Sequence, residues 1–380
     1  MIERASNKSL YNKINKSMQQ LKNIKTPEER FALSNYIVNL YSAIEAIEDN
    51  QVSINKKSIF GSEKNYKKHI RKIDFHNIKL IDNYILYKDF HKKLLGNIIK
   101  KIDNNIDQEE ILIFNNLSEN DFYDIFYQFM KSINLELLFD EFIKNKNIYA
   151  TNKNDDTTLG FALYNPLNKN SDIFINDFDY SLDSMLVLAH EFGHIYDFNT
   201  FNEEIEKYNK YFYESFYSET YSKLFEKLLL DFLYKQNILH EQTKNLCLYA
   251  QANAYEIILC TYILSLLDNE VFKNNSYTYL SKKSIINAVK KYFNNNESIL
   301  DCVNYWTTFD LLDDYSYAYG EIISLFLKEE INKNGLDNEL INNFNNIRSS
   351  VFTPDFIVNN NIDSEKYLKI YRKDIEKAKN

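Results

Sequence analysis

Residues 190–194 read HEFGH, which places two histidines four residues apart with a glutamate directly after the first. Positions i and i+4 share one face of an α-helix, so the imidazoles of His190 and His194 can bind the same metal ion. Glu191 points off that face, where a base is needed to take a proton from a water that the metal activates. The pattern predicts a zinc centre that performs hydrolysis.

The segment around this motif, residues 181–197, has the features of a helix that begins at a cap. Ser181 can cap its start, and Asp183 lies in its first turn, where a carboxylate is favoured. Asp197 follows His194 by three residues. A metal-bound imidazole commonly donates its other N–H to a carboxylate, so Asp197 or Glu226 could accept that bond; a surface Asp at the helix end is the alternative.

Two histidines leave a catalytic zinc site one protein ligand short. Neither His nor Cys lies close by in sequence, so we expect a downstream carboxylate. Three glutamates lie in a charged loop, where we expect them to be solvated, and three lie on a predicted helix over about 211–235. The candidates are Glu203, Glu204, Glu206, Glu214, Glu219 and Glu226.

HEFGH is followed by a second segment, ETYSKLFE at 219–226. Together the two segments resemble the thimet oligopeptidase and oligoendopeptidase F family of zinc peptidases. That family carries HExGH followed by E-x-x-S-x-x-x-E on the next helix. The resemblance implies that His190, His194 and Glu219 bind one zinc ion and that Glu191 is the catalytic base. It covers about residues 155–330 of a chain that is short for this family.

A tyrosine-rich segment, DYSYAYG at 314–320, is similar to the family's segment that contacts the substrate or the developing oxyanion. By this resemblance Tyr317 is the catalytic tyrosine, with Tyr315 and Tyr319 as substrate-binding residues. Tyr317 lies about 200° around a helix from Tyr315, so the three cannot share one face; packing roles for all three are the alternative. The histidine that usually precedes this segment is absent from 304–314. The DIFIND segment at 172–177 resembles the family's strand at the edge of the cleft.

The rest of the chain is expected to be mainly α-helical. Only 6 Gly and 3 Pro occur in 380 residues, which favours long helices. Helical spacing of apolar residues is found at 31–47, 78–102 and 121–143, and Pro27 suits a first helical turn after a cap at Thr26. The β-prone segments 148–151, 159–165 and 172–176 predict a small antiparallel sheet beside the active-site helix. With the resemblance, the fold expected is zincin-like.

We expect a helical N-terminal region at 1–150 that forms one cleft wall. A peptidase region at 151–332 and a helical tail at 333–380, after a turn at 332–335, would follow. His69, His76 and His91 lie among lysines and are expected at the surface.

The net charge of −9 argues against a nucleic-acid-binding protein. Residues 56–101 nevertheless hold 13 Lys/Arg against 4 Asp/Glu, and 171–241 hold 14 Asp/Glu against 5 Lys/Arg. Solvated helix faces explain such runs, with a partner- or substrate-binding surface as the alternative. Three cysteines, an N-terminus without an apolar stretch and the lack of a membrane-length apolar run lead us to expect a cytoplasmic protein without membrane contact.

These observations together favour a zinc metalloendopeptidase that acts on short peptides. Two alternatives remain from the sequence. One is an inactive binding protein that keeps the fold, and the other is a narrow processing protease for one protein partner.

Overall fold

A computed structural model describes residues 3–4, 7–24, 27–48, 86–102, 116–151, 159–165, 170–200, 217–271, 311–347 and 353–379. Contacts divide the chain into two compact units. Unit 1 comprises Met1–His76, Ile113–Tyr213 and Leu228–Asn237, and unit 2 comprises Asn77–Leu112, Glu214–Lys227 and Ile238–Asn380. The N-terminal helices and the sheet that precedes the HEFGH helix fall in unit 1. The domain boundaries expected at 150 and 332 stay a prediction.

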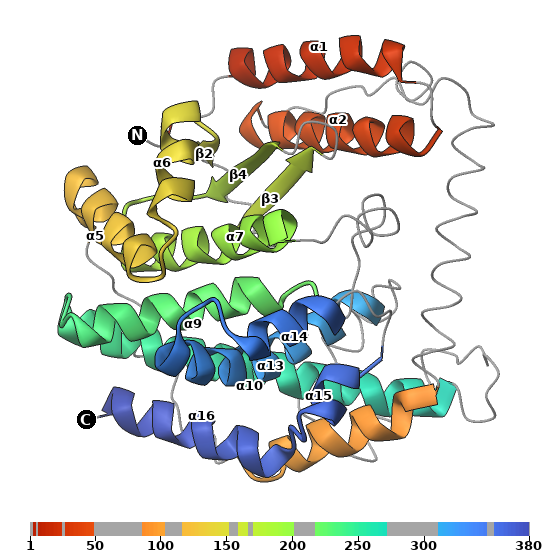
Figure 1. Ribbon diagram of the computed structural model, residues 1–380, viewed down its shortest axis with the longest axis vertical. Helices are drawn as coiled ribbons and strands as arrows, with labels where there is room; N and C mark the ends of the chain where they lie inside the picture. The colour runs from red at the N-terminus through yellow and green to blue at the C-terminus, as the bar shows by residue number, and fades with distance from the viewer. Residues whose placement is uncertain are drawn as a thin grey trace. The chain divides into compact units, whose positions relative to one another are not determined.

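Unit 1 holds a small sheet and five described helices (Figure 1). The strands are β1 (Glu3–Arg4), β2 (Ile148–Thr151), β3 (Gly160–Asn165) and β4 (Asn170–Asn176). The helices are α1 (Asn7–Asn23), α2 (Pro27–Glu48), α5 (Glu119–Ser132), α6 (Glu136–Asn145) and α7 (Leu182–Thr200). The expected helices at 31–47 and 181–197 and the three expected strands are confirmed. Thr26 lies outside the described residues.

The sheet has the order β1-β2-β4-β3, and it is mixed. β1 pairs with β2, and β2 with β4, in parallel, whereas β3 and β4 are antiparallel. The expectation of an antiparallel sheet is therefore confirmed for β3 with β4 and wrong for β2 with β4, and β1 is a strand that the sequence analysis did not predict. Turn residues between strands show that the chain reverses, but they do not show whether the next strand becomes a neighbour; here the chain passes from β2 to the far edge and returns as β4. DIFIND is accordingly an interior strand, and β3 lies at the edge.

Both faces of the sheet are covered, as the buried run Ile173, Phe174 and Ile175 in β4 requires. Phe174 stacks between Tyr149 of β2 and Phe161 of β3, with ring centroids 4.9 and 4.8 Å apart. Phe174 also joins the apolar core that α1 and α2 form. The sheet lies between α2 and α7 in Figure 1, and α7 packs on β3 and β4. The HEFGH helix is thus backed by a sheet that is itself held in place by two further helices.

The apolar stretch at 121–143 forms two helices instead of one. Asn134 adopts a φ of 60°, in the left-handed region, and separates α5 from α6. Asn tolerates this conformation better than most residues, so it is suited to the break. The two helices pack on each other, and both present phenylalanines to α7.

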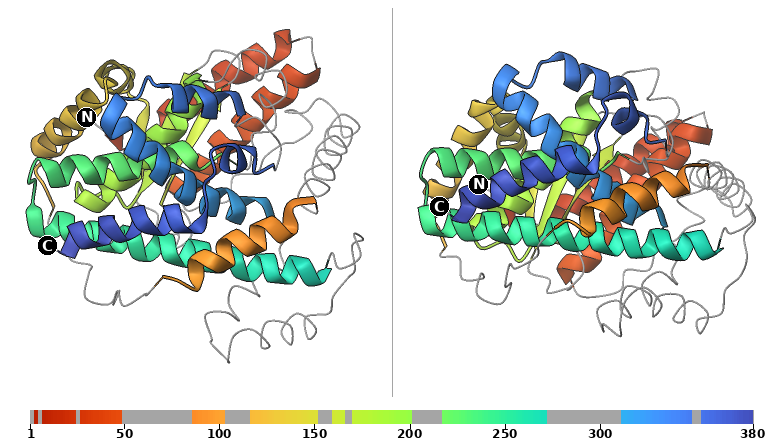
Figure 2. Two further views of the ribbon diagram at one scale, coloured as in Figure 1. Left: turned by 60° about the horizontal axis from the view of Figure 1, so that its bottom comes forward. Right: turned by 90° about the horizontal axis from the view of Figure 1, so that it is seen from below.

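The regular elements described in unit 2 are all helices, and residues 86–99 form one of them. Its longest helix, α10, contacts α13 and α16, and Figure 2 shows α16 lying along α10. Gly335, at a φ of 78°, follows the end of α13 where a turn is expected. α9 begins in unit 2 and continues into unit 1. The helices are α9 (Thr220–Lys235), α10 (His240–Val271), α13 (Leu311–Asn334), α14 (Glu339–Ile347), α15 (Asp355–Asn359) and α16 (Ser364–Lys379).

His91 is fully buried, so the expectation of a surface position is wrong for this residue. Its Nδ1 shares a hydrogen bond with the hydroxyl of Tyr319 at 2.5 Å, and its ring lies 5.6 Å from the ring of Tyr315. His91 lies on the apolar face of the helix at 86–99. The lysines next to it in the sequence made this face hard to recognise. His69 and His76 are outside the described residues.

Burial lowers the pKa of His91 from its ordinary 6.5 to about 3. The folded state therefore resists protonation that the unfolded state accepts, so stability is complete above pH 6.5 and falls as the pH drops toward 3. We expect His91 to cost about 2 to 3 kcal/mol of unfolding free energy between pH 7 and 4.5. Urea unfolding at both pH values checks this, with His91→Gln as the non-titrating variant. Equal losses in the variant and the wild type would contradict the assignment.

No helix among the described residues is both long enough and apolar enough to cross a membrane.

Candidate metal centre

The start of α7 is fixed by the serine cap that the sequence predicts. The backbone N–H of Ser184 donates to Ser181 Oγ at 3.1 Å. Asp179 Oδ1 in turn accepts from the Ser181 N–H at 3.0 Å and from Ser184 Oγ at 2.8 Å. These bonds satisfy N–H groups that have no partner within a helix, and they set where the first turn begins.

Phe192, the third residue of HEFGH, determines how α7 is rotated about its axis. Its ring lies among Phe126, Phe139 and Phe142, with centroids 5.6, 5.8 and 5.2 Å away. Residues two apart on a helix point about 200° apart, so burying Phe192 on this side turns His190 toward the other. The motif thus contains its own hydrophobic anchor, which sequence reasoning did not identify.

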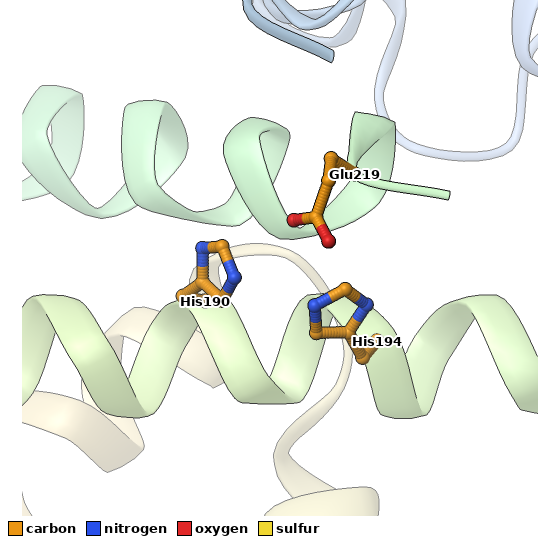
Figure 3. A group of neighbouring side chains, drawn as sticks. All are labelled: His190, His194 and Glu219. Carbon is orange, nitrogen blue, oxygen red and sulfur yellow. The ribbon is translucent and has the colours of Figure 1, made fainter. Parts of the chain in front are cut away.

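His190, His194 and Glu219, the three ligands that the resemblance implies, lie together as a group that could hold a metal ion. One potential ligand atom from each side chain lies within 4.8 Å of the others. The two imidazoles are tilted by 76° with centroids 5.0 Å apart, and Figure 3 shows the Glu219 carboxylate facing both. The histidines are half-buried and Glu219 is buried. Two imidazoles and a carboxylate are a donor set that catalytic zinc uses, with a fourth position left for water or substrate.

Glu219 stands directly before α9 and is held by Ser222, the serine of the E-x-x-S segment. Ser222 Oγ lies 2.8 Å from Glu219 Oε2 and 2.9 Å from the Glu219 carbonyl oxygen, positions suited to donation. The carbonyl also accepts the N–H of Lys223 at 3.0 Å, so Glu219 caps the helix. The helix expected over 211–235 therefore begins at Thr220, after a turn at 217–219; Glu214 lies outside the described residues, as do Glu203, Glu204 and Glu206.

Gly320 of α13 lies against the backbone of Glu219. A Cβ added at Gly320 would stand 2.8 Å from the Glu219 carbonyl oxygen and 2.9 Å from its carbonyl carbon. Backbone atoms cannot rotate aside as a flexible side chain can. Gly320 therefore allows the close helix approach at which the ligand Glu219 is positioned.

We expect Gly320→Ala to lower zinc affinity by about 10- to 100-fold, the range found when groups that orient a metal ligand are altered. Competition with a zinc chelator measures this. Gly335→Ala is the matched control, because its added Cβ meets nothing within 4 Å but its φ of 78° is strained for alanine. The control should lose stability and retain zinc affinity. Equal affinity losses would show that Gly320 acts through stability alone.

Glu191 is buried, with 3% of its surface exposed, and it lies against the first residue of the edge strand. A Cβ at Gly160 would stand 2.9 Å from Glu191 Oε1 and 2.9 Å from Val187 Cγ1. The missing side chain at Gly160 thus leaves room for the carboxylate beside the histidines. Six glycines in 380 residues make each one informative, and this rarity was the available signal for Gly160 and Gly320.

The two carboxylates considered as acceptors for imidazole N–H groups have different surroundings. Asp197 is buried at 3% exposure, so it is not the surface residue of the alternative interpretation. Glu226 accepts hydrogen bonds from Lys223 Nζ at 2.9 and 3.2 Å. A role for either one beside a metal-bound histidine stays a prediction.

The tyrosines of α13 divide between two environments. Tyr315 and Tyr319 are 0% exposed and both pack on His91. A contact of either one with substrate stays a prediction. Tyr317 is half-buried, and its ring lies 5.9 Å from Lys223 Nζ on α9. The i, i+4 spacing of Tyr315 and Tyr319 places them on one face, and His91 buries that face. Lys223 was not identified from the sequence.

Comparison with known proteins shows a similarity of fold to two solved structures. No family model and no curated protein matches the chain. A PZ peptidase A, solved with an inhibitor, superposes with a TM-score of 0.50 at 14% identity over 78% of this chain and 57% of that one. A protein of Bacillus anthracis str. Ames, assigned as an oligoendopeptidase F, gives a TM-score of 0.46 at 14% identity over 92% and 60%. This chain thus spans less than two thirds of either structure, and its fold is peptidase-like and mainly helical.

Proposed function

We propose that this protein is a zinc-dependent metalloendopeptidase that hydrolyses short peptides. The observation that carries the proposal is the convergence of His190, His194 and Glu219, with ligand atoms within 4.8 Å of one another. Glu191 follows the first ligand directly on α7 and is buried beside it. A buried carboxylate costs free energy unless other groups compensate, so a fold that only needed α7 as a structural helix would not require one here.

Zinc, when bound, would polarise the scissile carbonyl and bring the pKa of a bound water toward about 7. Glu191 would accept the proton of that water and pass it to the leaving amine. The space that the missing side chain of Gly160 leaves admits this carboxylate next to the histidines. By its resemblance to the family segment, Tyr317 would donate a hydrogen bond to the oxygen on which negative charge develops.

The decisive experiment measures metal content and peptide turnover on the same purified protein. We expect one zinc per chain by elemental analysis and cleavage of members of a mixed peptide library. A chelator should stop cleavage, and returning zinc should restore it. Stoichiometric zinc without cleavage would instead favour the inactive binding protein. Cleavage that survives complete zinc removal would refute the metal mechanism.

A further inference from the structure

Two lysines of α9, one turn apart, connect that helix to α13; Lys223 is buried and Lys227 is partly buried. The side chain of Lys223 is 6% exposed and that of Lys227 is 12% exposed. Both pair with Glu321 of α13, itself 3% exposed; Lys223 Nζ lies 3.5 Å from Glu321 Oε1, and Lys227 contacts the other oxygen. Charges are buried at a cost unless they are paired, so this cluster sets how the two helices meet.

Lys223 makes two contacts that set it apart from Lys227. Its Nζ donates to both carboxylate oxygens of Glu226, and it lies over the ring of Tyr317 at 5.9 Å from the centroid. A cation within about 6 Å of an aromatic face is attracted by the ring's quadrupole. In the part of the chain that the structure describes, Lys227 has no corresponding ring contact.

Lys223 keeps its charge in this position. Burial alone would lower the pKa of its ammonium, but the carboxylates of Glu226 and Glu321 outweigh burial and raise it. The group at the ring of Tyr317 is therefore a cation held from two sides, with little freedom to move.

We propose that Lys223 is a positioning residue that acts through Tyr317. Its ammonium holds the tyrosine ring in one orientation and places positive charge beside the phenol. This inference rests on the proposed peptidase function, in which Tyr317 donates to the developing oxyanion. A donor that is already oriented costs no reorganisation in the transition state, and nearby positive charge strengthens its bond to an anion.

A purely structural role would not require this arrangement. Lys227 already pairs with Glu321, so the bond between the helices does not depend on Lys223 alone. What Lys223 adds is a cation at the tyrosine three residues before Gly320, on the helix that also packs against the ligand Glu219. Lys227 therefore represents the role of joining the helices alone, whereas Lys223 joins the helices and also contacts Tyr317.

The test compares Lys223→Met with Lys227→Met, each of which removes one ammonium that pairs with Glu321 and keeps most of the side-chain volume. We expect Lys223→Met to lower kcat about 10-fold with KM nearly unchanged, because the hydrogen bond that Lys223 orients, from Tyr317 to the oxyanion, is made mainly in the transition state. Lys227→Met should stay within about twofold of the wild-type kcat. Zinc content should equal that of the wild type in both variants.

A second measurement asks whether Lys223 works through the tyrosine hydroxyl. In a Tyr317→Phe background, which keeps a ring and removes the donor, Lys223→Met should reduce kcat by less than twofold. A phosphinic peptide, which mimics the tetrahedral transition state, should bind about 10-fold more weakly to Lys223→Met than to the wild type when titrated by calorimetry. Its affinity for Lys227→Met should be unchanged.

Equal kcat losses in Lys223→Met and Lys227→Met would overturn the inference, and so would an undiminished loss in the Tyr317→Phe background. If Lys223→Met does not fold, the paired variant Lys223→Met/Glu226→Gln removes both charges and replaces it in every measurement. An inactive wild type that binds zinc would refute the proposed function, and with it this inference. An active wild type with matched lysine variants would refute the inference alone.

Discussion

Exchanging Glu191 for glutamine is expected to remove nearly all peptide hydrolysis while zinc stays bound. The amide has almost the size of the carboxylate, so it fits in the space that Gly160 leaves. It cannot accept a proton as a carboxylate does, and a positioned general base contributes about 10²–10⁴-fold to the rate. Steady-state hydrolysis of a library-derived peptide and elemental analysis of the same sample measure both quantities.

Asp183→Asn provides the control, since Asp183 lies on the same helix about two turns before Glu191. That variant should hydrolyse peptides at close to the wild-type rate. Parent-rate hydrolysis by Glu191→Gln would show that the proton is accepted elsewhere. Loss of zinc from Glu191→Gln would show that the exchange disturbs the neighbouring ligands, and a lower rate would then say nothing about a base.

Glu219→Ala is expected to lose zinc, and its hydrolytic activity with it. Altering a group that orients a ligand weakens metal binding by about 10–100-fold. Removing one of the three protein ligands themselves should weaken zinc binding further. Retained metal can be measured after dialysis against buffers of fixed free zinc concentration. Asp231→Asn, which changes an acid on α9, the helix that Glu219 caps, is the control and should keep full occupancy.

Undiminished zinc in Glu219→Ala would remove Glu219 from the ligand set and make Glu214 the next candidate. A graded result is also informative, because Ser222 bonds the Glu219 carboxylate at 2.8 Å. A Ser222→Ala variant with a smaller loss than Glu219→Ala would identify Ser222 as the group that orients the ligand.

The parts of the site that could be predicted from sequence are those that depend on local geometry or on family spacing. His190, Glu191 and His194 follow from helical periodicity, and Ser181 from cap chemistry. Glu219 followed from the resemblance of ETYSKLFE to the family's E-x-x-S-x-x-x-E segment, and the structure places it near the histidines. None of these needs knowledge of which distant segments meet.

The parts that sequence did not predict depend on such meetings. His91 is buried by α13, more than two hundred residues away, although its sequence neighbours are lysines. The parallel pairing of β2 with β4 depends on a strand order that turn residues do not encode. Gly160 and Gly320 are important because atoms of other elements lie where their side chains would be. In the sequence Lys223 resembles a surface lysine, and only the structure shows Glu321 and Tyr317 beside it.

The two-sided packing of α13 means that its tyrosines are not interchangeable. Because Tyr315, Tyr317 and Tyr319 lie within five residues, one hydroxyl could be expected to replace another after mutation. His91 ties Tyr319 into the interior, and Tyr315 packs on the same histidine ring. Turning the helix to present either one would expose that buried cluster and move Gly320 away from Glu219. In the proposed mechanism, therefore, neither Tyr315 nor Tyr319 can take over the hydrogen bond assigned to Tyr317 without unpacking this cluster.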